Sequence, residues 1–133
     1  MTNVPGMGFD QYHEPADELP ARTRTFARLC ASLTEEAEAI GWYEQRIALE
    51  QDPEALAVMR NAQTEEFKHF SMDLEFLFRR TPVWRDIAAG ILFKEGDIVE
   101  AGEEAEEGAG LGGSGGGEQP GSLGIGSLRG TGL

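Results

Sequence analysis

Glu65-Glu66-Phe67-Lys68-His69 is the stretch of this 133-residue chain that decides its fold, because it holds a Glu-x-x-His pair. On a helix, residues three positions apart lie on one face, so Glu66 and His69 can reach one metal ion. Glu36, thirty residues upstream, is a candidate carboxylate from a preceding helix. Carboxylate-bridged di-iron sites in helical bundles take one Glu from each of two helices and a Glu-x-x-His pair from each of two others. The chain supplies half of this set, so a complete site requires two copies.

By itself the tetrapeptide is weak evidence, because Glu-x-x-His arises by chance in helices rich in Glu. A solvated polar pair is then the better explanation. The surrounding sequence reverses that preference, since Glu36 and Glu66 both interrupt apolar stripes with helical spacing. Unpaired buried carboxylates are strongly disfavoured, and a metal ion is the simplest compensation. The stripe members are Leu29, Leu33, Ile40, Tyr43 and Ile47 around Glu36, and Leu56, Met59, Phe70, Leu74 and Leu77 around Glu66.

The pattern predicts an all-α fold built on an antiparallel two-helix hairpin. The first helix begins between Pro15 and Pro20, both of which suit a helix start, and runs to about Gln51. The segment Asp52-Pro53-Glu54 has the order of an N-cap, a first-position proline and an acidic first turn. A second helix therefore follows closely, and a short connection makes the pair antiparallel.

A short third helix is expected after the hairpin. Arg79 and Arg80 suit the negative end of the second helix, and Thr81-Pro82 has the form of a cap that opens another. This helix reaches about Phe93 or Lys94. The first and second helices then supply two of the four helices around the metal site, and dimerisation supplies the other two.

Composition divides the chain into four regions. Residues 1–14 are expected to be disordered, and residues 15–95 to form the helical domain. Residues 96–121 are acidic and then rich in Gly, which is typical of a flexible linker. A passive tail has no need of spaced apolar residues, so we interpret residues 122–133 as a docking peptide. Its apolar residues are Leu123, Ile125 and Leu128.

Charge and cysteine content limit the functional classes. A net charge of -13 and a pI near 4.4 argue against nucleic-acid binding. An acidic surface attracts cations, although solubility explains it as well. Cys30 is the only cysteine and fits a reducing cytosol. The N-terminus has no basic-then-apolar pattern, and no apolar run is long enough for a membrane span. The foldable part is about 80 residues long, which is marginal for an independent core, so self-association is expected.

Residues near the candidate ligands have alternative explanations. Glu35 and Glu38 lie on other faces of the first helix, where they either collect iron or simply solvate the helix. Trp42 and Tyr43 are more often packing residues than redox residues. Asp73, one turn after His69, is either a surface residue or a partner that orients the imidazole.

With these residues in hand, the chain resembles the encapsulated ferritins, the ferritin-like cargo proteins of bacterial encapsulin nanocompartments. The resemblance covers nearly all of the folded part and the tail. The tail segment, residues 121–129, is similar to the peptide that docks such cargo on the inner wall of the shell. The other matching stretches are His13-Glu14-Pro15, Glu35-Glu36-Ala37-Glu38-Ala39-Ile40-Gly41-Trp42-Tyr43-Glu44-Gln45-Arg46 and Glu65-Glu66-Phe67-Lys68-His69.

The resemblance implies a ferroxidase that oxidises Fe2+ to Fe3+ at a di-iron centre between two subunits, with Glu36, Glu66 and His69 of each chain as ligands. It implies a ring of dimers, a homodecamer in this family, working in the cytoplasm inside the encapsulin shell that stores the iron. Glu35 and Glu38, with Trp42 beside them, match the site where iron enters. Ca2+ or another divalent cation is a further candidate ligand there.

Two other functions remain open at this stage. A non-catalytic helical adaptor or metal-binding dimer with the same docking tail predicts binding of Zn2+ or Ca2+ without oxygen consumption. A peroxidase or oxygenase of the wider di-iron class has less support, because so short a chain offers no obvious pocket for an organic substrate.

Overall fold

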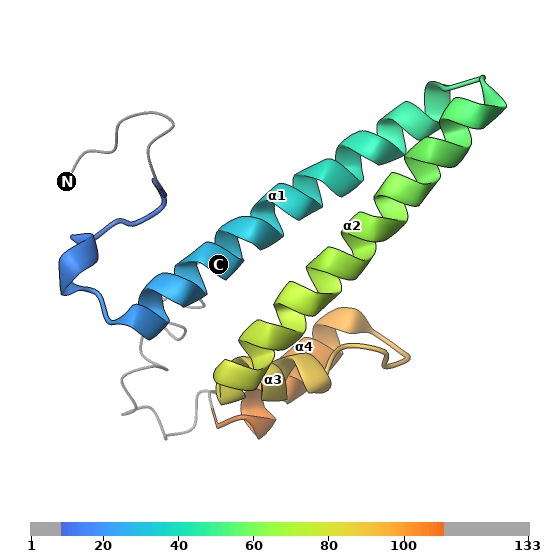
Figure 1. Ribbon diagram of the computed structural model, residues 1–133. Helices are drawn as coiled ribbons and strands as arrows, with labels where there is room; N and C mark the ends of the chain where they lie inside the picture. The colour runs from blue at the N-terminus through green and yellow to red at the C-terminus, as the bar shows by residue number, and fades with distance from the viewer. Residues whose placement is uncertain (1–8, 111–133) are drawn as a thin grey trace. The chain divides into compact units, whose positions relative to one another are not determined.

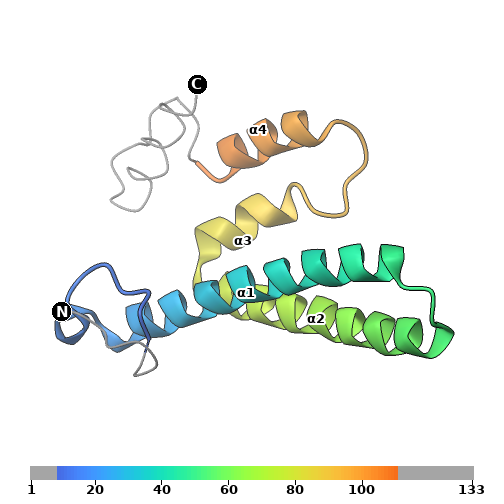
Figure 2. The ribbon, with the colours of Figure 1, turned by 90° about the horizontal axis from the view of Figure 1, so that it is seen from above.

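The computed structural model describes residues 9–110, and within that range the chain is helical and contains no β-strand. Helix α1 spans Ala21–Leu49 and helix α2 spans Pro53–Arg80. Figures 1 and 2 show α1 and α2 side by side and antiparallel, joined by a short turn. The predicted all-α hairpin is therefore confirmed. None of the helices in residues 9–110 is long and apolar enough to cross a membrane.

Asp52 ends the turn between the long helices and starts α2. Its Oδ1 accepts hydrogen bonds from the backbone N–H groups of Glu54 and Ala55, both at 2.9 Å. These N–H groups have no partner within the helix, so the carboxylate stabilises its first turn. The N-cap predicted from the sequence is confirmed. Helix α1 ends at Leu49, slightly before the predicted Gln51.

The hairpin covers few of its own apolar side chains. Within residues 9–110, Leu77 is the one fully buried apolar residue and Gln63, 9% exposed, the one buried polar residue. The apolar residues that flank Glu36 and Glu66 in the two stripes are half-buried, apart from Leu77. Trp42, Phe67 and Met72 are exposed by 52%, 48% and 60%. Helices gain most of their stability from tertiary packing, so this surface is suited to contact with a further element.

The chain divides into two compact units, and the division falls after Leu77 in the last turn of α2. The second unit contains α3, Pro82–Ala89, and α4, Ile98–Gly108. A Cβ atom added to Gly90 would lie 2.6 Å from the Cβ of Ala105. The absence of a side chain at Gly90 thus allows the end of α3 to approach α4 closely.

The third helix is shorter than predicted. It ends at Ala89, and residues 90–93 continue as a turn rather than reaching Phe93 or Lys94 as helix. Phe93 has a φ of 62°, a left-handed conformation that a regular right-handed helix excludes. Gly90 lowers the helical propensity of this segment and provides the close approach to Ala105.

The prediction that the acidic segment within residues 96–121 is a flexible linker is wrong for its first part, which forms α4. Asp97 caps this helix, because its Oδ1 accepts a hydrogen bond from the N–H of Glu100 at 2.8 Å. Glu and Ala are strong helix formers, and Asp97-x-x-Glu100 has the spacing of a capping pair. The residues of this region beyond 110 lie outside the described range, as does the whole candidate docking segment with Leu123, Ile125 and Leu128.

The described part of the N-terminal segment contacts α1. Residues 9–14 form no helix, and a 3-10 turn follows at Ala16–Glu18. The guanidinium of Arg28 lies 5.9 Å from the centre of the Tyr12 ring, within the range of a cation–π contact. Arg24 Nη1 donates to the carbonyl of Ala16 at 3.1 Å. These contacts attach the segment to the start of the hairpin.

Candidate metal centre

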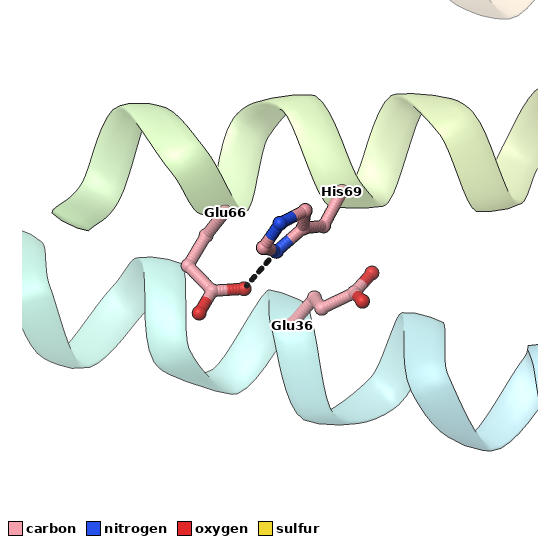
Figure 3. Close-up of side chains that lie close together, drawn as sticks. All are labelled: Glu36, Glu66 and His69. Carbon is pink, nitrogen blue, oxygen red and sulfur yellow. Dashed lines mark ion pairs between the residues drawn. The ribbon is translucent and has the colours of Figure 1, made fainter. Parts of the chain in front are cut away.

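Glu36, Glu66 and His69 meet between the two long helices. One ligand atom of each lies within 4.8 Å of the others, and no other such group of His, Cys, Asp or Glu is found in residues 9–110. Figure 3 shows Glu36 extending from α1 and the other two from α2, all into the space between the ribbons. The three residues proposed from sequence spacing are therefore brought together within one chain.

The two residues from α2 contact each other across one helical turn. His69 Nδ1 lies 3.7 Å from Glu66 Oε1, longer than a hydrogen bond and within the range of an ion pair when the imidazole is protonated. The side chains are 25% exposed for Glu66 and 47% exposed for His69. His69 is therefore accessible from outside the hairpin, where a second copy can approach.

The neighbouring Glu65 has a different environment. Its Oε1 forms a 2.8 Å ion pair with Lys68 Nζ, and both side chains are about half exposed, at 47% and 57%. The hydrogen bond and charge of Lys68 lower the pKa of Glu65. Of the two adjacent carboxylates, Glu66 is thus the one that faces Glu36.

Glu36 lies in an environment that disfavours its charged form. Burial raises its pKa from 4.5 to about 7, and a hydrogen bond with Asp73, the charge of Asp73 and the charge of Glu66 act in the same direction, while His69 opposes them. Glu36 Oε1 and Asp73 Oδ2 are buried and have no donor among the described residues. A proton shared between the two carboxyl groups, or a cation bound beside them, would relieve their repulsion.

The donor set at this position fits iron. Carboxylate oxygens and a neutral imidazole are ligands that ferrous iron accepts in proteins, and a cation also neutralises clustered carboxylates. The buried and unpartnered oxygen of Glu36 is an available donor atom. Three protein ligands are too few for two metal ions, so one hairpin by itself does not complete a dinuclear site.

The other sequence candidates lie around this group. Glu35 and Glu38 are exposed on α1, on faces away from Glu36 as expected. Trp42 is 52% exposed, whereas Tyr43 is half-buried with the guanidinium of Arg46 at 5.4 Å from its ring centre. Asp73 contacts Glu36 on the facing helix, a partner that the sequence analysis did not consider.

Sequence reasoning missed Gln63, the buried amide between the helices. Gln63 Nε2 donates to the backbone carbonyl of Ile40 at 3.2 Å and to Glu44 Oε1 at 3.0 Å. A signal was present, because Gln63 lies four residues after Met59 and three before Glu66, inside the apolar stripe of α2. A polar residue at such a position requires a hydrogen-bonding partner.

Comparisons with known proteins agree on one group of relatives. Residues 11–95 match the model of the EncFtn-like family. An encapsulated ferritin-like protein of Rhodospirillum rubrum is 40% identical over 122 residues, covering 89% of this chain and 87% of that protein. A ferritin-like protein of Thermotoga maritima is 39% identical over 100 residues, covering 75% of this chain and 88% of that protein.

A solved structure has the same fold. The crystal structure of protein ne0167 from Nitrosomonas europaea superposes with a TM-score of 0.64 at 36% sequence identity. The match covers 67% of this chain and 98% of the other. Residues 11–95, which the family model matches, include the segments that carry Glu36, Glu66 and His69.

Proposed function

This chain belongs to the EncFtn-like family, and from that premise we propose that it is a ferroxidase that works as cargo of an encapsulin shell. The family is ferritin-like, which fits a role in iron handling. The observation that carries the proposal is the convergence of Glu36, Glu66 and His69 from two helices onto one position. The specific activity, oxidation of Fe2+ by dioxygen, is our inference from that arrangement.

The proposed site forms where two hairpins meet. Two chains contribute four Glu and two His, which is the set expected of a dinuclear carboxylate site. Such sites hold two metal ions roughly 3.5 to 4 Å apart. The 47% exposure of His69 supports this assembly, because a ligand that completes a site between subunits must be accessible in the single chain.

The surface beside His69 is suited to a second helix pair. Ala55, Ala62, His69 and Phe76 follow one another at intervals of seven residues, which places them along one side of α2. All except His69 are half-buried in the single chain. Alanine at two of these positions allows the backbone of a partner to come close, and its contact would cover His69.

Each side chain has a separate role in the proposed reaction. Glu36 and Glu66 bind and bridge the Fe2+ substrate, and His69 gives one neutral nitrogen ligand to each ion. Each Fe2+ loses one electron, and dioxygen accepts the electrons together with protons from water. Glu36 gives up its proton to solvent when Fe2+ binds, because metal ligands must be deprotonated, and Asp73 contacts Glu36 from the facing helix.

The proposal also covers the entry of iron, the location of the protein and its assembly. Glu35 and Glu38 are exposed carboxylates on α1 that attract divalent cations and form the proposed iron entry site. Trp42, also exposed on α1, is assigned to the same site. We place the protein in the cytoplasm within an encapsulin compartment, held there by its C-terminal segment. The product Fe3+ passes to the lumen of the shell for storage, and the dimers assemble into a ring, a decamer on the pattern of the family.

An oxygen-electrode measurement with added Fe2+ tests the activity. A ferroxidase consumes oxygen in proportion to the iron supplied, and Zn2+ at the site inhibits the reaction because it binds without redox chemistry. A non-catalytic metal-binding adaptor of the same fold binds Zn2+ or Ca2+ and consumes no oxygen above the rate of iron in buffer. That second result would rule out the proposed activity while leaving the metal site intact.

A further inference from the structure

We propose that Gln63 is a positioning residue for the iron site: its amide fixes the register of α1 against α2 so that Glu36 faces the Glu66–His69 pair. This inference rests on the proposed function for its consequence, but its structural part can be tested without iron. Gln63 is the one buried polar residue within residues 9–110, and it contributes no ligand atom to the metal group.

Both N–H groups of the Gln63 amide have acceptors on α1. One is the carbonyl of Ile40 at 3.2 Å and the other is Glu44 Oε1 at 3.0 Å. Ile40 and Glu44 are four residues apart, so the amide joins two successive turns of α1. A side chain held by two acceptors along the helix axis resists sliding in either direction.

The two hydrogen bonds of Gln63 lie one helical turn from the metal ligands on both helices. Glu36 precedes Ile40 by four residues, and Glu66 follows Gln63 by three. At about 1.5 Å of rise per residue, Glu36 and Glu66 lie about 5 to 6 Å along the helix axes from Ile40 and Gln63, respectively. Rigid helical backbone connects them, so the register set at Gln63 is transmitted to Glu36 and Glu66.

The apolar contacts of the hairpin do not define this register by themselves. The stripe of α1 repeats its apolar residues at alternating intervals of four and three, so a slip of two turns again aligns apolar residues with apolar residues. Apolar burial is non-directional, whereas one buried polar side chain can specify register in paired helices. A slip of even one turn, about 5.4 Å, would separate Glu36 from Glu66 and His69.

The first test measures the register directly. Spin labels are attached at Thr34→Cys on α1 and Ala57→Cys on α2, both exposed positions, in a Cys30→Ser background. Labelled chains are diluted in excess unlabelled chain so that only distances within one chain are measured. The parent should give one narrow distance, and Gln63→Leu should give a broadened distribution or a second distance, which reflects a slip along the axis of about 5 Å for one turn or about 11 Å for two turns. An unchanged narrow distance in Gln63→Leu overturns the proposal.

The second test follows the consequence for the metal site with Co2+, which binds without oxidation and has a ligand-dependent visible spectrum. Gln63→Leu should weaken Co2+ binding by about 10- to 100-fold, the usual effect of residues that orient ligands. Its melting temperature should stay near that of the parent, because replacing a buried polar group by an apolar one of similar volume is often neutral. If Gln63 only stabilises the fold, Gln63→Leu should instead have a lower melting temperature, with an unchanged affinity for Co2+ and an unchanged Co2+ spectrum.

Two variants complete the design. Gln63→Arg keeps N–H donors for both acceptors and should restore the narrow distance and the affinity, whereas Asn61→Leu makes the same kind of change at an exposed position of α2 and should alter neither. Should Gln63→Leu fail to fold, Gln63→Met gives the same test with an unbranched side chain. If the parent itself does not bind Co2+, the proposed function fails, and the distance measurement still decides the role of Gln63.

Discussion

Glu36 and Asp73 lie on facing helices of the hairpin, and the closeness of the two acidic side chains raises the pKa of Glu36. Each has a buried oxygen without any donor among the described residues. The arrangement is stable when one proton is shared and unfavourable when both groups are charged. Below about pH 7, Glu36 therefore carries a proton at the position where the proposed reaction binds Fe2+.

The first prediction concerns the pH dependence of the metal-free protein. The pKa of Glu36 is raised from 4.5 to about 7 in the folded chain, so between these pH values the folded state holds a proton that the unfolded state has lost. The stabilising contribution is complete below about pH 4.5 and is lost as the pH rises through about 7. Thermal unfolding in the presence of a chelator should show stability decreasing over that window.

The control for this prediction replaces the titrating group. Glu36→Gln is neutral at every pH and should flatten the decrease, whereas Glu38→Gln, at an exposed position on the same helix, should leave it unchanged. Equal pH dependence in the parent and in Glu36→Gln would contradict the role given to Glu36.

The second prediction concerns the ligands. Glu36→Ala, Glu66→Ala and His69→Ala should each slow rapid Fe2+ oxidation by at least about 100-fold, since even residues behind a metal ligand contribute 10- to 100-fold. Stopped-flow absorbance of Fe3+ measures the rate. Glu65→Ala is the matched control, because Glu65 is paired with Lys68 on the surface and should retain near-parent oxidation. Unchanged rates in all three ligand variants would show that iron is not oxidised at this site.

The third prediction is that a single chain is inactive. Ala62→Arg places a long charged side chain on the side of α2 that carries His69, and it should convert dimers to monomers in sedimentation experiments. Rapid oxidation should disappear in the same variant, although all three ligands remain. Thr64→Arg, on an exposed part of α2 pointing elsewhere, should keep both the dimer and the activity. Fast oxidation by a folded monomer would disprove the shared site.

The fourth prediction concerns the contact between α3 and α4. Gly90→Ala should destabilise the second unit by about 1 to 3 kcal/mol, because the new Cβ would lie 2.6 Å from the Cβ of Ala105. Faster hydrogen exchange of the α4 amides measures the loss. Gly102→Ala adds the same methyl group with only an ordinary contact, 3.8 Å from Ile91 Cδ1, and should not destabilise. The double variant Gly90→Ala with Ala105→Gly should recover protection if the clash is the cause.

The sequence was sufficient for the features that depend on local spacing. Glu66 and His69 share a face because of helical periodicity, and Asp52 caps α2 because a carboxylate precedes Pro53. Features that depend on contacts between distant segments were missed. The approach of Gly90 to Ala105 gives α4 a partner, and the contact of Asp73 with Glu36 depends on the register between two helices. Neither relationship follows from the periodicity of a single helix.

The fifth prediction concerns the C-terminal segment, whose structure lies outside the described residues. Deleting residues 122–133 should abolish loading into a co-expressed encapsulin shell, because the three spaced apolar residues of the proposed docking peptide are removed. Oxidation by the truncated protein in free solution should remain at the parent level, since no metal ligand is lost. A narrower variant, Leu123→Ser with Ile125→Ser and Leu128→Ser, should give the same loss at unchanged length. Continued packaging of both variants would show that another part of the chain binds the shell.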